Sequence, residues 1–356
     1  MPRTMLGAVL LASAACSHAP PPAETAKVER RDEWLLALRS DLNRTAANDG
    51  FEGQVRVMHA GKPEIDRSFG DAACLPLGGG RRLLAAVAVG LLVEDGKLGW
   101  EDRLDRRLPS VAGTSFAPLS VANLLTDSAG LAPDSQIPVG QKLDASASTG
   151  FGSVGGVRTP PLDERLDAAG KAPLQATPGT RVDPGDDRPW LLVERLVTQV
   201  SGEPFDRFAE GRVLGPSAMT GTSLTATPPC PAATRGTTTL EDQFRFIEAL
   251  RKGKLVSPQT RDALWEPRLP LGPGSDVGYG FFVRTRGEQR AVGAGSEGLT
   301  TAYELWLDPA GTDGLVLLGR TQARTARGIR TALGEFYALP PGPPHSGGPP
   351  RHPPVH

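Results

Sequence analysis

Hydrophobic and polar positions repeat with two different periods along the chain, and these periods separate strands from helices. Residues 54–59 alternate as a strand does, and residues 64–69 are the return strand after a short hairpin turn. Residues 82–94 are apolar almost without interruption, which predicts a buried helix. Apolar positions at helical spacing predict further helices around 193–200 and 240–247, the second one introduced by a threonine run suited to capping.

The remaining segments complete an α+β pattern. Residues 130–185 are rich in Gly, Ser and Pro and show little periodicity. The order of elements predicts an antiparallel sheet flanked by helices, with a mainly helical lobe inserted between the two parts of the sheet. We place the sheet part at about 31–115 and 238–338 and the lobe at about 116–237. Besides the elements above, we expect helices over 33–46 and 321–337 and strands over 279–283, 301–307 and 314–318.

Both ends of the chain lie outside this predicted domain, which spans 31–338. Residues 1–16 have the features of an export signal, with a short apolar core and small residues before Cys16. They resemble a bacterial lipoprotein signal, although Ser13 stands where Leu is usual, and Cys16 would then be the acylated N-terminus. Plain secretion is the alternative, and a cytosolic N-terminus is the least favoured. Residues 17–30 are predicted to be a flexible tether and 339–356 a disordered Pro/Gly-rich tail.

Composition narrows the function classes. The formal net charge of -1 argues against a nucleic-acid binder. Three cysteines exclude a disulfide-dense scaffold and a cysteine-rich zinc site, and we expect no metal or cofactor. If Cys16 is lipidated, Cys74 and Cys230 remain, and an exported protein permits a disulfide between them. The sequence does not fix their separation, so this pairing stays open.

Several phrases resemble the serine β-lactamase-like family, which includes class C β-lactamases, penicillin-binding proteins, D-alanyl-D-alanine carboxypeptidases and related esterases. Their order and spacing resemble the family from about residue 50 to 335. The resemblance implies a β-lactamase/transpeptidase-like fold and a catalytic serine. The phrases are FEGQVRV at 51–57, LVEDGKL at 92–98, NLLTDSAGL at 123–131 (similar to the family's HLLTHTSGL), VSGEPF at 200–205, GPSAMTGTS at 215–223 and GYGF at 278–281.

The family's first catalytic motif, Ser-x-x-Lys at the start of a buried helix, is missing. There the serine attacks the substrate, and the lysine one turn later takes its proton. Counting back from LVEDGKL places these positions at Gly79 and Arg82. Glycine carries no nucleophile, and arginine stays protonated and cannot act as a base. Between Ser68 and Ser110 the chain has no Ser or Thr, so a shifted register does not restore the motif.

The other two motifs are missing as well. Tyr-x-Asn is expected at 185–187, where the chain has Gly185 and Asp187 at the outer positions, and all three tyrosines lie in the last third. His-x-Gly or Lys-Thr-Gly is expected at Ala294 to Ser296, within a region that contains no His and no Lys. Three losses together predict a family member without catalytic residues, in which the retained phrases specify packing and turns.

The glycine- and arginine-rich segment before the buried helix has two interpretations. Backbone N–H groups of Gly79 and Gly80, with Arg81 and Arg82, resemble an anion site for a carboxylate or phosphate. The alternative, which we favour, is that Gly79 is a lost serine and that Arg82 pairs with an acid such as Asp186 or Asp187. A buried arginine needs such a partner in either case.

Two other segments carry chemical groups that need weighing. Asp186 and Asp187 could be paired general acids, but an Asp pair after Pro-Gly is more typical of a turn and a helix cap. Ser296 and Glu297 could suggest a nucleophile and a base, but adjacent strand residues point to opposite faces.

These observations predict an exported, catalytically inactive envelope protein that binds a ligand or partner through a degenerate cleft. A peptidoglycan fragment or another envelope protein is the partner that the resemblance suggests, with membrane contact only through a lipid anchor. The first alternative is an active β-lactamase, carboxypeptidase or esterase that uses non-standard residues. The second is a structural lipoprotein without a ligand.

Overall fold

A computed structural model provides the structure. The residues that it describes are 36, 40, 42–44, 51–70, 75–133, 153–154, 157–158, 162–225, 235–286, 289–297, 301–309, 311 and 313–320. Two predicted helices fall largely or wholly outside these residues: the helix over 33–46, of which residues 36, 40 and 42–44 are helical, and the helix over 321–337. The predicted export signal, tether and C-terminal tail also lie outside them.

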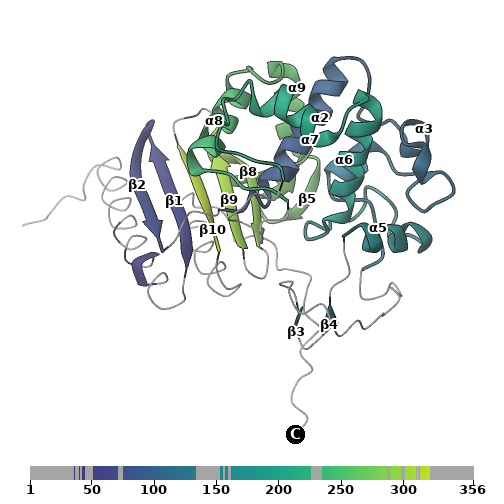
Figure 1. Ribbon diagram of the computed structural model, residues 1–356, viewed down its shortest axis with the longest axis horizontal. Coiled ribbons are helices and arrows are strands. Elements are labelled where there is room, and N and C mark those ends of the chain that lie inside the picture. Colours follow the sequence, from purple (N-terminus) through teal and green to yellow (C-terminus); the bar gives the residue numbers. More distant parts are fainter. Residues whose placement is uncertain are drawn as a thin grey trace, which may run out of the picture.

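One antiparallel sheet of eight strands forms the left part of the molecule in Figure 1. The N-terminal hairpin β2-β1 pairs with the last strand, β10, so the two ends of the described chain meet in the sheet. The spatial order is β2-β1-β10-β9-β8-β7-β6-β5. The strands are β1 (Glu52–His59), β2 (Lys62–Phe69), β5 (Leu269–Gly272), β6 (Ser275–Val277), β7 (Phe282–Arg286), β8 (Gln289–Glu297), β9 (Thr301–Leu307) and β10 (Gly314–Arg320).

The helices gather on the other side of the picture, and most of them lie between β2 and β5 in the sequence. This arrangement confirms the α+β fold with an inserted, mainly helical part. The helices are α2 (Gly80–Glu94), α3 (Leu104–Arg107), α4 (Val121–Leu125), α5 (Leu162–Lys171), α6 (Arg188–Ser201), α7 (Phe205–Ala209), α8 (Leu240–Arg251) and α9 (Pro258–Trp265), with short helical turns at Pro109–Val111 and Glu210–Leu214. A separate pair of two-residue strands comprises β3 (Ser153–Val154) and β4 (Val157–Arg158).

The sequence pattern missed three strands of the sheet and misplaced a fourth. The strand expected over 279–283 begins at Phe282, because Gly280 has a φ of +82° and turns the chain just before it. β8 was not predicted, because its sequence QRAVGAGSE contains few of the β-branched and aromatic residues that favour strands. β5 and β6 are short, and β5 contains Pro270 and Gly272, residues that usually indicate a turn.

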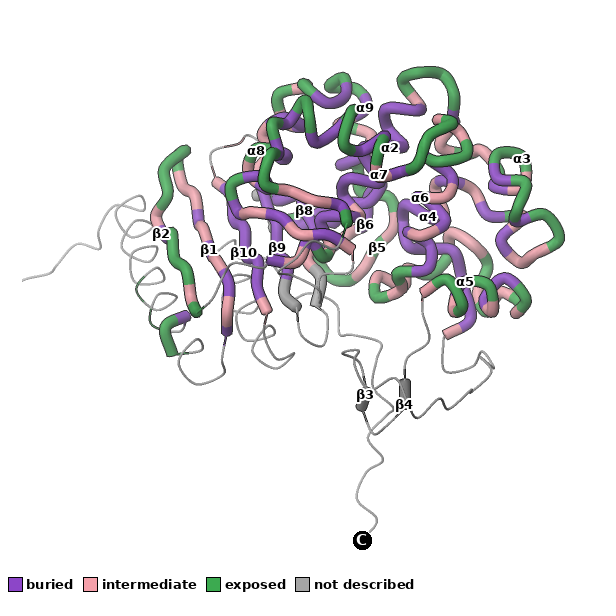
Figure 2. The backbone as a smooth tube through the Cα atoms, in the orientation of Figure 1, coloured by how far each residue is buried: buried purple, intermediate pink, exposed green. Residues whose placement is uncertain are grey.

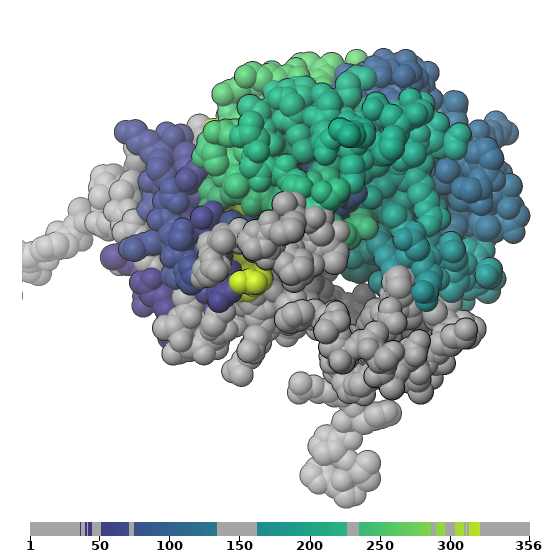
Figure 3. Space-filling model, viewed as in Figure 1, coloured from purple at the N-terminus to yellow at the C-terminus, as the bar shows by residue number. Residues whose placement is uncertain are grey.

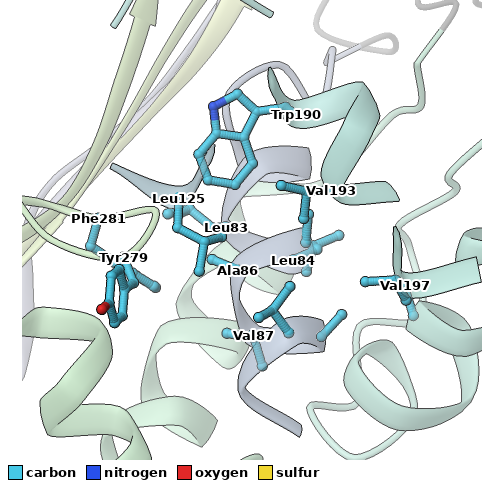
Figure 4. Packing of buried hydrophobic residues seen from close by; sticks show 14 of the residues in the cluster. Leu83, Leu84, Ala86, Val87, Leu125, Trp190, Val193, Val197, Tyr279 and Phe281 are labelled. Atoms are coloured by element: carbon cyan, nitrogen blue, oxygen red, sulfur yellow. The ribbon is translucent and has the colours of Figure 1, made fainter. Parts of the chain in front are cut away.

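Helix α2 is the centre of the larger hydrophobic core. Its residues 83–92 are all buried, so the helix packs on every side, as its continuous apolar sequence predicted. Figure 4 shows its side chains between those of α6 and of the Tyr279–Phe281 turn. The tube in Figure 2 shows burial continuing from α2 into the central strands. Figure 3 shows the teal and green helical residues forming a continuous surface on this face. The N-terminus of α2 is therefore held between the helical part and the sheet.

Candidate functional site

The start of α2 is a glycine turn pressed against the sheet. Gly78 has a φ of +49°, Gly79 is the N-cap residue and Gly80 begins the helix. A Cβ atom on Gly80 would lie 2.9 Å from the Leu77 side chain and 3.1 Å from the Tyr303 hydroxyl, so a larger residue would force its neighbours apart. The Gly80 N–H donates to the Leu77 carbonyl at 2.8 Å. The position predicted for the nucleophile thus lies where expected, at the N-terminus of a buried helix.

Arg82 lies in the first turn of α2, and its guanidinium group is almost fully enclosed. Its Nη2 atom lies 2.6 Å from Oδ2 of Asp127, and its Nε donates to the Gly280 carbonyl at 3.1 Å. The guanidinium carbon lies 4.6 Å from the Trp190 ring centroid and 4.7 Å from that of Phe282. The acidic partner is therefore Asp127, and the expectation of Asp186 or Asp187 was wrong, because the turn after α4 brings Asp127 to the first turn of α2.

Asp127 is 1 % exposed and has a φ of +50°, which is uncommon for a residue other than glycine. Its Oδ1 accepts a hydrogen bond from Trp190 Nε1 at 2.7 Å, and its backbone carbonyl accepts one from the Asp183 amide at 2.7 Å. Burial raises the pKa of the Asp127 carboxyl to about 6, although the neighbouring Arg82 charge opposes that rise. The carboxyl is thus held by α2 and α6 together.

Arg81 points to a different set of carboxylates. Its Nε and Nη2 atoms donate to the two oxygens of Glu194 at 2.8 and 3.0 Å, and Nη2 also donates to Asp206 at 2.6 Å. Its Nη1 donates to the Leu224 carbonyl at 2.8 Å. Arg235 adds a second cation to Glu194 at 2.6 Å. This network ties α2 to α6 and α7.

The four residues of the anion-site hypothesis can now be placed. Gly79 and Gly80 start α2, while Arg81 and Arg82 each have a carboxylate partner from this chain. In this arrangement Asp127 occupies the position beside Arg82 that a carboxylate ligand would take. Binding of an external anion here stays a prediction.

The Gly185 to Asp187 segment leads into α6. Asp186 accepts hydrogen bonds from the Arg188 backbone N–H at 2.9 Å and from its guanidinium at 2.8 and 2.7 Å. Asp187 is the N-cap residue of α6, but among the described residues its side chain accepts no capping hydrogen bond. Asp187 is exposed at the surface, but the surrounding groups partly desolvate its carboxyl and raise its pKa, and the Arg235 charge opposes that rise. The Asp186 side chain therefore stabilises the turn before α6, as its position after Pro-Gly predicted.

Ala294 and Ser296 lie on β8, near the middle of the sheet. Ala294 is buried and pairs with Leu305, and the backbone of Ser296 pairs with Tyr303 on β9. Tyr303 is the residue whose hydroxyl lies against Gly80. Tyr303 thus lies against Gly80, the residue after the predicted nucleophile position, and its backbone pairs with that of Ser296. Trp190 joins the start of α6 to Arg82.

The three cysteines, Cys16, Cys74 and Cys230, lie outside the described residues. Within the described ranges, no group of three His, Cys, Asp or Glu side chains is arranged to hold a metal ion. No described helix is both long and apolar enough to cross a membrane.

Comparison with known proteins agrees with this architecture. The β-lactamase family pattern matches residues 81–335, which is more than half of the chain. The protein therefore belongs to the β-lactamase family. A comparison with curated protein sequences gives no match.

Solved structures share the fold at low sequence identity. A penicillin-binding protein from Bacillus halodurans has a TM-score of 0.64 at 18% identity, over 82% of this chain and 98% of its own. The octameric penicillin-binding protein homologue from Pyrococcus abyssi has a TM-score of 0.67 at 17% identity, over 86% and 78%. The D-stereospecific amidohydrolase from a Streptomyces species has a TM-score of 0.65 at 15% identity, over 83% and 97%.

Sequence reasoning missed Asp127, although a signal for it was present. In the phrase NLLTDSAGL, Asp127 stands where the family phrase LLTHTSGL has a histidine. An acid in that place, together with arginine at position 82, indicates a charge pair. The pair was not found because the two residues are far apart in the sequence and meet only because α2 and α4 both pack against α6.

Proposed function

We propose that this chain is a non-catalytic member of the β-lactamase family that acts by binding a ligand or partner. The observation that supports this most strongly is the Arg82–Asp127 pair. It fills the place predicted for the catalytic base and leaves a glycine at the place predicted for the nucleophile. Arginine cannot accept a proton at any working pH, and the neighbouring carboxyl is too deeply buried to reach a substrate.

The remaining parts of the proposal concern location and ligand. We propose that the protein is exported to the bacterial cell envelope and anchored there through Cys16. A peptidoglycan fragment is the ligand class suggested by the family, and another envelope protein is the alternative partner. The degenerate site around Gly79 is where we expect the contact.

Hydrolysis assays test the loss of catalysis. Purified mature protein would be incubated with a chromogenic ester and a chromogenic cephalosporin, with an active β-lactamase-family hydrolase as positive control. We expect turnover no faster than in buffer. If the protein hydrolysed either compound and a single point substitution in this chain abolished that hydrolysis, the result would instead support an enzyme with non-standard residues.

Calorimetric titration with peptidoglycan fragments tests the binding part of the proposal. We expect saturable binding to the mature protein, weakened by Arg82→Ala if a ligand carboxylate enters the site. Arg212→Ala is the matched control, because Arg212 forms a surface pair with Asp95, which caps the opposite end of α2 from Arg82. The absence of binding to any fragment would favour a protein partner or a structural role instead.

A further inference from the structure

The Arg82 guanidinium and the Trp190 indole present two partners to a single carboxyl group. Nη2 of Arg82 lies 2.6 Å from Oδ2 of Asp127, and Nε1 of Trp190 donates to Oδ1 at 2.7 Å. Each oxygen of the carboxyl group therefore has its own partner, and the Asp127 side chain is fully shielded from solvent. A dry site with a cation at one oxygen and a neutral donor at the other is suited to recognising a carboxylate.

The two partners keep their positions without help from Asp127. Nε of Arg82 donates to the Gly280 carbonyl at 3.1 Å, and the rings of Trp190 and Phe282 lie 4.6 and 4.7 Å from the guanidinium carbon. Trp190 itself belongs to α6 and is buried. Because aromatic faces attract cations, these contacts hold the guanidinium in place with or without a carboxylate beside it. The site is therefore preorganised.

The turn that carries Asp127 is held through its backbone. The Asp127 N–H donates to the Leu124 carbonyl at 3.2 Å, and the Asp127 carbonyl accepts from the Asp183 amide at 2.7 Å. The φ of +50° at Asp127 is one that glycine adopts without strain. Asp127→Gly therefore removes the carboxyl group and preserves the path of the chain. In that variant the two partners face a space of about the size of one carboxylate group.

We propose that Arg82 and Trp190 form a receptor for one carboxylate group and that Asp127 is its built-in ligand. The native chain thereby closes the start of α2 to external carboxylates, because the receptor is already filled. This deepens the proposed function, on which its biological meaning rests: a ligand or partner of the degenerate site meets groups other than the Arg82 guanidinium. Once the Asp127 side chain is removed, the receptor should accept a free carboxylate.

The available space selects among free carboxylates. Formate consists of the carboxylate group alone, so it fits beside Arg82 and Trp190 after a small shift away from the backbone. The methyl group of acetate adds volume where the Asp127 methylene was joined to the backbone, and the buried, close-packed surroundings leave no room for longer chains. We therefore expect formate to bind most tightly, acetate more weakly and propionate not measurably.

Urea unfolding of Asp127→Gly at pH 7 with increasing formate tests the receptor. A ligand that binds only the folded form raises the folding equilibrium constant, and we expect a rise of about tenfold at about 0.2 M sodium formate relative to sodium chloride at the same concentration. In the same variant the Trp190 indole N–H resonance should shift saturably as formate is added. A response no larger than that to chloride, or a Trp190 resonance that does not move, would overturn the proposal.

Three controls identify the receptor as the place where formate binds. The unaltered protein should not respond, because Asp127 occupies the receptor. The double variant Arg82→Met, Asp127→Gly should not respond either, because it lacks the cation. Asp95→Gly removes the carboxylate beside Arg212, whose side chain is 43% exposed at the surface, and should also show no response. An equal response in any of the three would refute the receptor, because formate would then act elsewhere.

A loss of folding in Asp127→Gly does not remove the test. If the variant is unfolded in buffer, formate should restore the native far-UV circular dichroism, acetate should do so less well, and sodium chloride should not. A variant that stays unfolded up to about 1 M formate would contradict the proposal, because a ligand of the folded form must shift the folding equilibrium.

The receptor and the proposed function fail separately. Ester or cephalosporin turnover would refute the non-catalytic role without affecting the response of Asp127→Gly to formate. A missing formate response would refute the receptor and leave the absence of catalysis intact.

Discussion

Arg82 and Asp127 show how two residues that are distant in the sequence depend on each other in the fold. An arginine alone at the first turn of α2 would be a buried, uncompensated charge, and so would an aspartate alone after α4. Together they form an ion pair at 2.6 Å that is covered by Trp190 and Phe282. The position at which we predicted the catalytic base thus forms a structural contact.

Removing one member of the pair should cost far more than removing both. Asp127→Ala leaves the Arg82 guanidinium without its carboxylate and should lower the free energy of unfolding by about 3–5 kcal/mol. The double variant Arg82→Met, Asp127→Leu should lose less than either single variant, Arg82→Met or Asp127→Leu, because it leaves no unpaired buried charge. Urea unfolding at pH 7 measures Asp127→Ala, the double variant and the single variants Arg82→Met and Asp127→Leu.

A surface ion pair provides the control for this comparison. Arg212 and Asp95 also form a salt bridge, at 3.1 Å, but the Arg212 side chain is 43% exposed. Asp95→Ala should change the free energy of unfolding by about 1 kcal/mol or less. Additive losses at Arg82 and Asp127 would mean that the two side chains do not act as a pair.

At the scale of residues, prediction from the sequence succeeded where a count of residue types or charges was enough. The absence of Ser and Thr between Ser68 and Ser110 needs no structure, and the need of Arg82 for an acid follows from charge alone. The identity of that acid was missed, although Asp127 stands where the family phrase has a histidine, because the residue lies far from Arg82 in the sequence. It depends on a turn with a positive φ at Asp127, which no local pattern indicates.

At the scale of elements, the turn before β7 fixes the position of α2. Gly280 has a φ of +82°, and a Cβ atom added to it would lie 2.3 Å from the Cβ of Ala86 and 3.3 Å from the Trp190 ring. The turn therefore needs glycine for two reasons, its backbone conformation and its close approach to the helix. Its carbonyl then reaches Arg82.

Gly280→Ala should destabilise the protein through both effects. The positive φ costs about 1 kcal/mol or more, and the clash with α2 adds about 1–3 kcal/mol. Gly202→Ala is the matched control, because Gly202 has a φ of +83° and no atom within 4 Å of an added Cβ. Thermal unfolding should show a clearly larger loss at Gly280. Equal losses would show that contact with α2 contributes nothing.

Element prediction followed the strength of the local pattern. The hairpin β1-β2, the buried helix α2 and the strand β9 were predicted from periodicity, because alternation or continuous apolar sequence is strong there. β8 contains small residues, since Gly293 and Gly295 lie directly against backbone and side-chain atoms of β9. Its strand conformation is imposed by pairing on both sides, which local propensity does not reveal.

At the scale of the whole molecule, the fold was predictable and the function only in part. The phrases shared with the β-lactamase family specify turns and packing, and they carry the α+β topology. The loss of the catalytic residues stays a prediction. The location in the cell depends on residues before the domain, which only the sequence describes. It stays a prediction.

Lipidation at Cys16 can be tested in cells. Cys16→Ala should move the protein from the membrane fraction to the soluble fraction, because a lipid anchor is the membrane attachment that we predict. Ser17→Ala is a suitable control and should leave the distribution unchanged. An unchanged distribution of the Cys16 variant would contradict the anchor.

The central claim is that this member of the β-lactamase family cannot form a covalent acyl-enzyme. Its most direct test is the intact mass of the mature protein after incubation with excess penicillin. We predict a mass identical to that of the untreated protein, because Gly79 offers no nucleophile and Arg82 no base. A stoichiometric adduct that a single substitution abolishes would contradict the account.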